Sequence, residues 1–219
     1  MDFDMQIMSN SKNSTSFPQK DNCRVLILGC GNSRLGEDMM KDGWRGEMAN
    51  VDFSNVVIKQ MKERYNDSLY RKIQAVQSRR LQQQQSEEFP KLVNDQDSSK
   101  RQRNRNKSQP IKKMTFEYAD VTKSLPFPDE NFDLVLCKGT LDSILCSNGS
   151  MLKCKQLMAE CHRVLHKSHG ILAVLSFGTP DNRLLYFEHE SKLLWHQVDV
   201  HKVPKCRGGK AVEGSNSSK

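Results

Sequence analysis

The sequence predicts an α/β protein with a doubly wound, mostly parallel sheet. Short apolar segments typical of buried strands alternate with amphipathic segments typical of helices along most of the 219 residues. A loop with two glycines, residues 29–33, directly follows the first of these strands. In sheets of this class, ligands bind beyond the carboxyl ends of the strands, where the strand order reverses. Candidate site residues are therefore sought at strand ends.

The first half of the predicted domain contains two strand–helix units. Residues 24–28 are expected to form a buried strand, and a helix is expected from about Arg34 to residues 41–43, where Gly43 favours a helix end. A second strand is expected over residues 46–52. The helix after it has its apolar positions at a 3.6-residue period; they are Val56, Val57, Ile58, Met61 and Tyr65.

The second half is expected to resume after a polar insertion. The expected strands are residues 115–119, 132–137, 170–177 and 195–203, and the expected helix is residues 151–165. Residues 125–131 and 138–150 are expected to be a turn and a loop. No further strand is evident after Val203, so the sheet is expected to have an incomplete C-terminal hairpin.

The domain is predicted to span residues 22–204, with an interruption at 74–113. Residues 71–113 carry 12 of the 34 Lys and Arg residues but 4 of the 26 Asp and Glu residues, together with nine Gln. Such a segment buries too little apolar surface to offset its ordering entropy, so we expect a disordered insertion. A disordered leader is expected over residues 1–21 and a disordered tail over residues 205–219.

Composition limits the classes of function. The rest of the chain has 22 residues of each charge sign, so the net charge of +8 belongs to the insertion and not to the domain. A generally basic nucleic-acid-binding domain is therefore disfavoured, and nucleic acid could bind only through the insertion. No apolar run is long enough to span a membrane. The seven cysteines have no C-x-x-C pair and no zinc-type spacing, so reduced thiols, no metal site and a cytoplasmic location are expected, with a nuclear location left open.

The glycine loop favours a nucleoside-type ligand. Gly29 and Gly31 allow a tight turn and a close approach of ligand to backbone. A dinucleotide-binding loop has its third glycine three positions after the second, whereas here Gly36 follows Gly31 by five. This spacing disfavours NAD and FAD and is compatible with S-adenosylmethionine.

Charged residues follow the other predicted strands. Asp52 could accept hydrogen bonds from both ribose hydroxyls, or could cap the next helix. Asp120 could accept from an adenine amine, or could belong to a turn. Lys138 could hold a cofactor carboxylate, or be a solvated charge. Asp142 could orient or deprotonate an acceptor amine, or cap a turn.

Five ordered motifs resemble those of class I S-adenosylmethionine-dependent methyltransferases. Residues 25–33, which end in the sequence LGCGNS, look like the first motif of the eukaryotic methyltransferase-like branch that includes lysine methyltransferases of elongation factor 1-alpha. Residues 50–58 are similar to the second motif. The next three motifs of the branch are similar to Asp120-Val121, residues 127–133 and residues 138–142 of this chain. The branch usually has an aspartate where this chain has Cys137.

The resemblance implies a Rossmann-like fold, S-adenosyl-L-methionine as the cofactor and methyl transfer to a protein lysine, with a translation elongation factor as the partner. It implies Asp142 as the catalytic residue. The cofactor-binding residues that it implies are Gly29, Cys30, Gly31, Asn32, Ser33, Asp52, Phe53, Asp120, Val121 and Lys138. Two alternatives remain: a methyltransferase for an N-terminal amine or a small molecule, and a weakly active or inactive member that acts as a binding protein.

Overall fold

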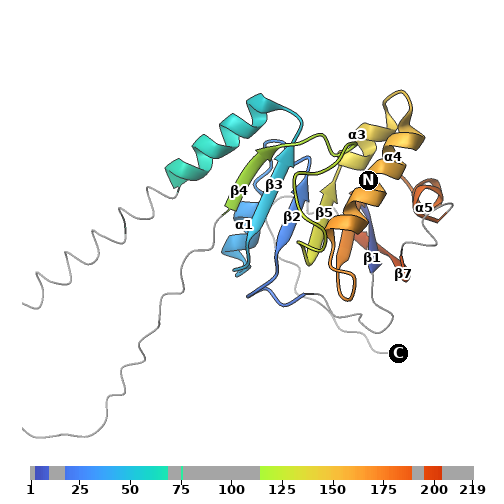
Figure 1. Ribbon diagram of the computed structural model, residues 1–219, viewed down its shortest axis with the longest axis horizontal. Helices are drawn as coiled ribbons and strands as arrows, with labels where there is room; N and C mark the ends of the chain where they lie inside the picture. The colour runs from blue at the N-terminus through green and yellow to red at the C-terminus, as the bar shows by residue number, and fades with distance from the viewer. Residues whose placement is uncertain (1–2, 10–17, 69–74, 76–113, 189–194, 204–219) are drawn as a thin grey trace, which may run out of the picture.

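A computed structural model describes residues 3–9, 18–68, 75, 114–188 and 195–203 of the chain. Within these residues, seven strands form one mixed sheet in the order β4-β3-β2-β5-β6-β1-β7 (Figure 1). The strands are β1 (Phe3–Ser9), β2 (Val25–Leu28), β3 (Met48–Asp52), β4 (Met114–Tyr118), β5 (Leu134–Lys138), β6 (Ile171–Ser176) and β7 (Gln197–Val203). This is the predicted doubly wound, Rossmann-like sheet.

Five neighbouring strands run parallel in the order β4-β3-β2-β5-β6, and β2 lies at their centre. It pairs with β3 on one side, where Leu28 is opposite Val51, and with β5 on the other, where Leu28 is opposite Cys137. All residues of β2 and β3 are buried, as continuous apolar strands in parallel sheets are. The chain crosses from β2 to β3 in one direction and later returns to β5, so the switch point of the sheet is at the carboxyl end of β2.

The leader prediction is wrong for residues 3–9, which form β1. This strand pairs antiparallel with β6, where Ile7 is opposite Ala173, and with β7, where Ile7 is opposite Asp199. Its side chains alternate between the two faces, with Met8 in one core and Ile7 in the other. No further strand was evident after Val203, and the strand that pairs antiparallel with β7 is β1, from residues 3–9.

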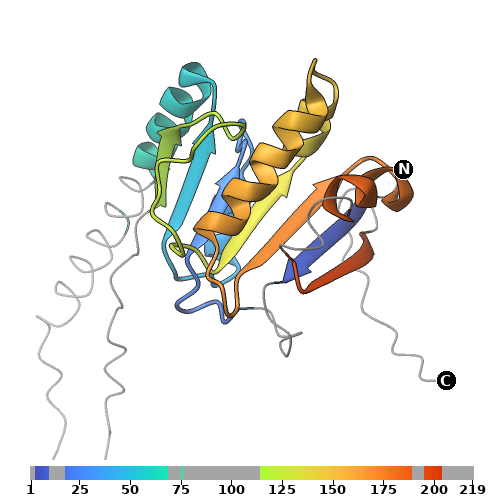
Figure 2. The same cartoon turned by 45° about the vertical axis from the view of Figure 1, so that its right-hand side comes forward.

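Helices cover both faces of the sheet (Figure 2). On one face, α3 (Thr140–Leu145) and α4 (Ser150–Val164) bury residues such as Leu141 and Leu157, and α5 (Pro180–Glu188) packs against α4. On the other, α1 (Leu35–Lys41) and a helix over residues 55–68 contribute Met39 and Met61. None of the helices that the structure describes is long and apolar enough to cross a membrane.

The other predicted elements are confirmed within a few residues, but two helices, α3 and α5, lie where no helix bounds were predicted. The expected loop at 138–150 contains α3, which begins after Gly139 in a left-handed conformation with φ of 72°. Six residues are too few for periodicity to distinguish a helix from a loop. The predictions for the insertion and the tail lie outside the described residues, except for Ala75, which is helical.

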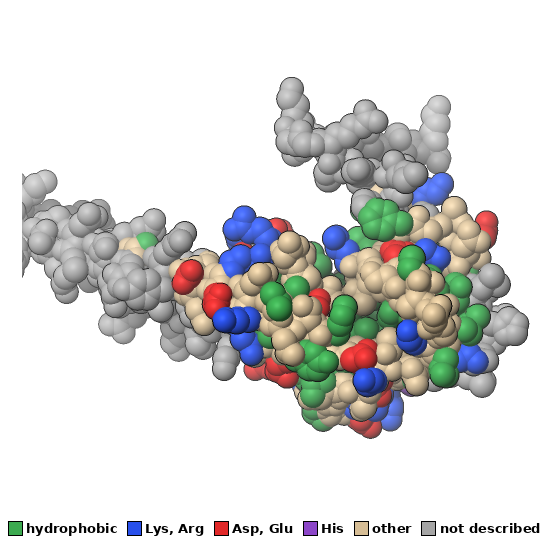
Figure 3. All heavy atoms as spheres, turned by 90° about the horizontal axis from the view of Figure 1, so that it is seen from above, with side chains coloured by type: hydrophobic (Ala, Val, Ile, Leu, Met, Phe, Trp, Pro, Cys, Tyr) green, Lys and Arg blue, Asp and Glu red, His purple; other side chains and the backbone are tan. Residues whose placement is uncertain are grey.

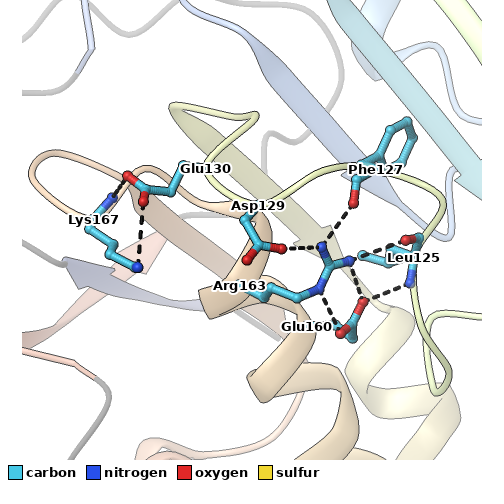
Figure 4. A network of polar contacts seen from close by, with 7 residues as sticks. All are labelled: Leu125, Phe127, Asp129, Glu130, Glu160, Arg163 and Lys167. Carbon is cyan, nitrogen blue, oxygen red and sulfur yellow. Dashed lines mark hydrogen bonds and ion pairs between the residues drawn. The ribbon is translucent and has the colours of Figure 1, made fainter.

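An arginine joins the turn before β5 to α4 (Figure 4). The guanidinium of Arg163 donates to both carboxylate oxygens of Glu160, from Nε at 2.9 Å and from Nη2 at 2.7 Å. It also donates to the carbonyls of Leu125 and Phe127 and, at 2.8 Å, to Asp129. Burial of the ion pair is substantial, and the pKa of the Glu160 carboxyl is lowered chiefly by its hydrogen bonds from Arg163.

Candidate cofactor and acceptor site

A cavity of about 640 Å³ opens at the carboxyl edge of the parallel strands. Figure 3 looks onto this edge from above. Seven residues singled out from the sequence line the cavity: Gly29, Gly31, Asp52, Phe53, Asp120, Val121 and Lys138. Its volume is within the range of small-molecule and cofactor sites. The switch point, the glycine loop and both predicted nucleoside-binding carboxylates therefore meet at one cavity.

The glycine loop is shaped by two left-handed residues. Gly29 has φ of 58°, and a Cβ there would overlap the side chain of Thr140, whose hydroxyl donates to the Leu28 carbonyl at 2.8 Å. Gly31 has φ of 51°, yet a Cβ there would meet no protein atom within 4 Å. Gly29 is thus required by packing. Gly31, by contrast, leaves room for a ligand beside the backbone.

Arg64, in the helix over residues 55–68, holds the same loop from the side. Its guanidinium donates to the carbonyls of Asn32 at 3.0 Å and Ser33 at 2.8 Å, and to the Glu37 carboxylate at 2.7 Å. Neither Asn32 nor Ser33 is among the cavity-lining residues, and Cys30 is buried beneath the loop. Burial, with the nearby Asp52 charge, raises the pKa of the Cys30 thiol to about 11, so it is protonated at neutral pH. No motif pointed to Arg64.

Asp52 ends β3 with a buried carboxylate, only 6% exposed, that faces the cavity. Its Oδ2 accepts from the Gly31 N–H at 2.9 Å, and its Oδ1 accepts from the Ser54 N–H at 2.9 Å. A carboxylate has about four acceptor positions. Each oxygen therefore keeps capacity for one more donor, as a ribose diol would provide.

Asp120 and Phe53 lie at the neighbouring strand ends. Thr122 donates to Asp120 Oδ1 from its hydroxyl at 2.7 Å and from its N–H at 3.0 Å, and these hydrogen bonds lower the pKa of the Asp120 carboxyl. The Phe53 side chain is 74% exposed although it lines the cavity, so its ring is open to a ligand. Val121, which is buried, adds an apolar surface between them.

The opposite side of the cavity is formed by the segment from β5 to α4. The lining residues there are Lys138, which ends β5, and Gly139, which follows it. Ser147, just before α4, and Lys153, within α4, also line the cavity. The Lys153 ammonium donates to the Ser147 hydroxyl at 2.9 Å. Neither residue was found from the sequence, because nothing in their spacing distinguishes them from a solvated helix end.

Asp142 is not among the lining residues. Its carboxylate accepts from Ser176 Oγ at 2.6 Å and from Arg183 Nη2 at 2.8 Å, on the side of α3 that faces β6 and α5. Cys137, where the branch has an aspartate, is fully buried between β2 and β6, and burial raises the pKa of its thiol to about 12. Among the described residues, no group of three potential ligands could hold a metal ion.

Comparison with known proteins gives consistent results. Residues 81–174 match the sequence family described as "Methyltransferase domain". The chain is 32% identical to the "eEF1A lysine and N-terminal methyltransferase" of Bos taurus over 69% of its length, and 31% identical to that of Xenopus laevis over 88%. These alignments cover 16% and 21% of the relatives, so the chain spans a small part of them.

A solved structure of a SAM-dependent methyltransferase from Methanosarcina mazei is also similar, with a TM-score of 0.47 and 17% identity over 77% of this chain and 58% of that one. The sheet order, the glycine loop at the switch point, the matched sequence family and the two relatives together support one assignment. The chain belongs to the class I S-adenosylmethionine-dependent methyltransferases, in the branch that includes the eEF1A lysine and N-terminal methyltransferases.

Proposed function

We propose that this chain binds S-adenosylmethionine in the cavity beside Gly31 and transfers its methyl group to a lysine of a protein. The observation that carries the proposal is the Asp52 carboxylate, which is buried, faces the cavity and is fixed by the Gly31 N–H. A diol accepted there would bring the nucleoside beside Phe53 and Asp120. The donor set fits an adenosyl group, because acceptors for hydroxyls and an amine lie around an apolar surface.

When bound, the cofactor would supply a methyl group on a sulfonium; a neutral acceptor amine would take this methyl group as the thioether leaves, and the methylammonium formed can release one proton. The residues of this chain would mainly bind and orient, because such a displacement depends on placement of the nucleophile. Lys138 and Lys153 add positive charge to the wall of the cavity. A nearby positive charge favours the neutral form of an acceptor amine.

The acceptor class is supported by the relatives, whose names specify lysine methylation of eEF1A. We propose an elongation factor as the substrate and the cytoplasm, where thiols remain reduced, as the location. An N-terminal amine is the second candidate, since the same names include N-terminal methylation. Both acceptors present an amine, the ε-amine of a lysine or the α-amine of an N-terminus.

Titration calorimetry tests the cofactor site. We expect a dissociation constant on the order of micromolar for the intact chain, corresponding to about −8 kcal/mol. Asp52→Asn should weaken binding at least about tenfold, because one acceptor oxygen is replaced by a donor. Asp38→Asn on α1, an exposed carboxylate outside the cavity, is the matched control and should bind as wild type.

Labelled cofactor then identifies the acceptor. The chain is incubated with labelled S-adenosylmethionine and a cell extract, and mass spectrometry locates the label on a lysine, an N-terminus or a small molecule. Label on a protein lysine supports the proposal. Cofactor binding without any labelled product contradicts the enzymatic part, and no binding heat for the wild-type chain refutes the proposal as a whole and favours a non-catalytic binding protein.

A further inference from the structure

The carboxylate of Asp142 is enclosed by donors from two other elements. Ser176 Oγ donates to Oδ1 at 2.6 Å, Arg183 Nη2 donates to Oδ1 at 2.8 Å, and the Phe177 N–H donates to Oδ2 at 3.2 Å. The Asp142 and Arg183 side chains are 18% and 17% exposed. This carboxylate is therefore occupied within the protein, and it is not part of the cavity wall.

The same donors are tied to one another. Arg183 Nε donates to Ser176 Oγ at 2.6 Å, and the Gly178 N–H donates to that oxygen at 3.2 Å. A Cβ at Gly178 would overlap the Arg183 guanidinium, so the glycine lets the arginine lie against the backbone. The network joins α3, the end of β6 and α5 through Asp142, Ser176 and Arg183.

The network anchors one end of the part of the cavity wall that residues 138–140 form. Lys138, Gly139 and Thr140 line the cavity immediately before Asp142 in the chain. Their other anchor is the Thr140 hydroxyl, which donates to the Leu28 carbonyl in front of the glycine loop. Nearer its start, the Gly139 N–H donates to the Leu175 carbonyl of β6 at 2.9 Å. A displacement of about 1 Å at such a wall can cost a hundredfold in rate.

We infer that Arg183 is a positioning residue for methyl transfer, which acts through Asp142 to hold residues 138–140 against the bound cofactor and acceptor, and that Asp142 does not remove the proton of the acceptor amine. The inference rests on the proposed function. The acceptor enters as the neutral amine after losing its proton to water, and the amine lone pair forms the new carbon–nitrogen bond while the carbon–sulfur electron pair stays on sulfur. Asp142 contributes geometry.

The test compares Asp142→Asn, Arg183→Gln and the double variant with wild type, using cofactor affinity, kcat, KM and the pH profile of kcat/KM. Arg163→Gln is the matched control: it removes an arginine with a similar carboxylate pair at a distance from the cavity wall. We expect kcat to fall about tenfold in each single variant and no further in the double variant, because both changes break one unit. The pH profile of Asp142→Asn should keep the wild-type shape, and Arg183→Lys should recover part of kcat. The control Arg163→Gln should keep the wild-type kcat at assay temperatures below its own melting temperature.

Hydrogen exchange supplies a readout that needs no turnover. Arg183→Gln should speed amide exchange in residues 138–142 more than in β2, whereas Arg163→Gln, which lowers global stability, should not speed exchange in residues 138–142 more than in β2. A pH limb lost in Asp142→Asn overturns the inference, as do unchanged kcat and unchanged exchange in Arg183→Gln. A wild-type chain that binds cofactor but methylates nothing refutes the proposed function, while faster exchange in Arg183→Gln would still support the anchoring of the segment.

Discussion

Replacing Arg163 with glutamine should be among the more destabilising surface-proximal substitutions in this protein. The guanidinium makes a two-point contact with Glu160 and donates to two carbonyls of the turn before β5. The side chains of Arg163 and Glu160 are 27% and 16% exposed, so water cannot fully replace these contacts. The contact with Asp129 counts for little, because that side chain is 70% exposed.

Breaking a partly buried ion pair from one side leaves the other charge without its partner, which costs about 3 kcal/mol. With a urea dependence of about 2 to 3 kcal/mol per molar, the unfolding midpoint should fall by about 1 to 1.5 M. Urea unfolding followed by circular dichroism measures it. Lys41→Gln breaks an ion pair of 2.7 Å with Asp38 in which both side chains are about 60% exposed, and should leave the unfolding midpoint close to that of wild type. If the midpoint for Arg163→Gln lies as close to wild type as that for Lys41→Gln, the reasoning is refuted.

Four other outcomes are expected. Arg64→Gln should weaken cofactor binding by about tenfold in calorimetry, because two loop carbonyls lose a charged donor; an unchanged affinity would exclude a role for Arg64 in shaping the loop. The lowered pKa of Glu160 adds stability that is fully present above the ordinary pKa of 4.5 and is lost as the pH falls through the pKa of the folded state. Glu160→Gln should therefore reduce the loss of stability at acidic pH in unfolding measured against pH, and an unchanged loss would contradict this prediction. Gly29→Ala should lower the melting temperature more than Gly43→Ala, although both have positive φ, because only Gly29 faces Thr140. Met8→Ala should cost about 2 to 5 kcal/mol in urea unfolding, whereas a disordered leader would give no loss.

The parallel part of the fold could be predicted because each strand carries its own signal. The strands at 25–28 and 171–176 are continuous apolar runs, and their local composition is enough to identify them. Strand β1 lacks such a run: Gln6 is polar yet fully buried, and the strand obtains its partners from β6 and β7, more than 150 residues away. Pairing over that distance leaves no local pattern.

The candidate site divides in the same way. Gly31, Asp52 and Asp120 were found because they follow strands and have the residue types that the ligand chemistry requires. Arg64 and Arg183 act through contacts with loop carbonyls and a carboxylate that lie far from them in sequence. An arginine on an amphipathic helix is otherwise indistinguishable from a solvated charge, so only the fold could identify them.

The central place of β1 between β6 and β7 has a consequence for biosynthesis. Residues emerge from the ribosome in order, so β1 cannot pair with β6 until residues 171–176 have been made, nor with β7 until residues 197–203 have been made. Until then it and the facing edge of β6 carry unpaired backbone groups, a situation that invites pairing with other chains. Closing so long a loop is slow, so β1 would stay exposed to pairing with other chains during the synthesis of the residues between β1 and β6.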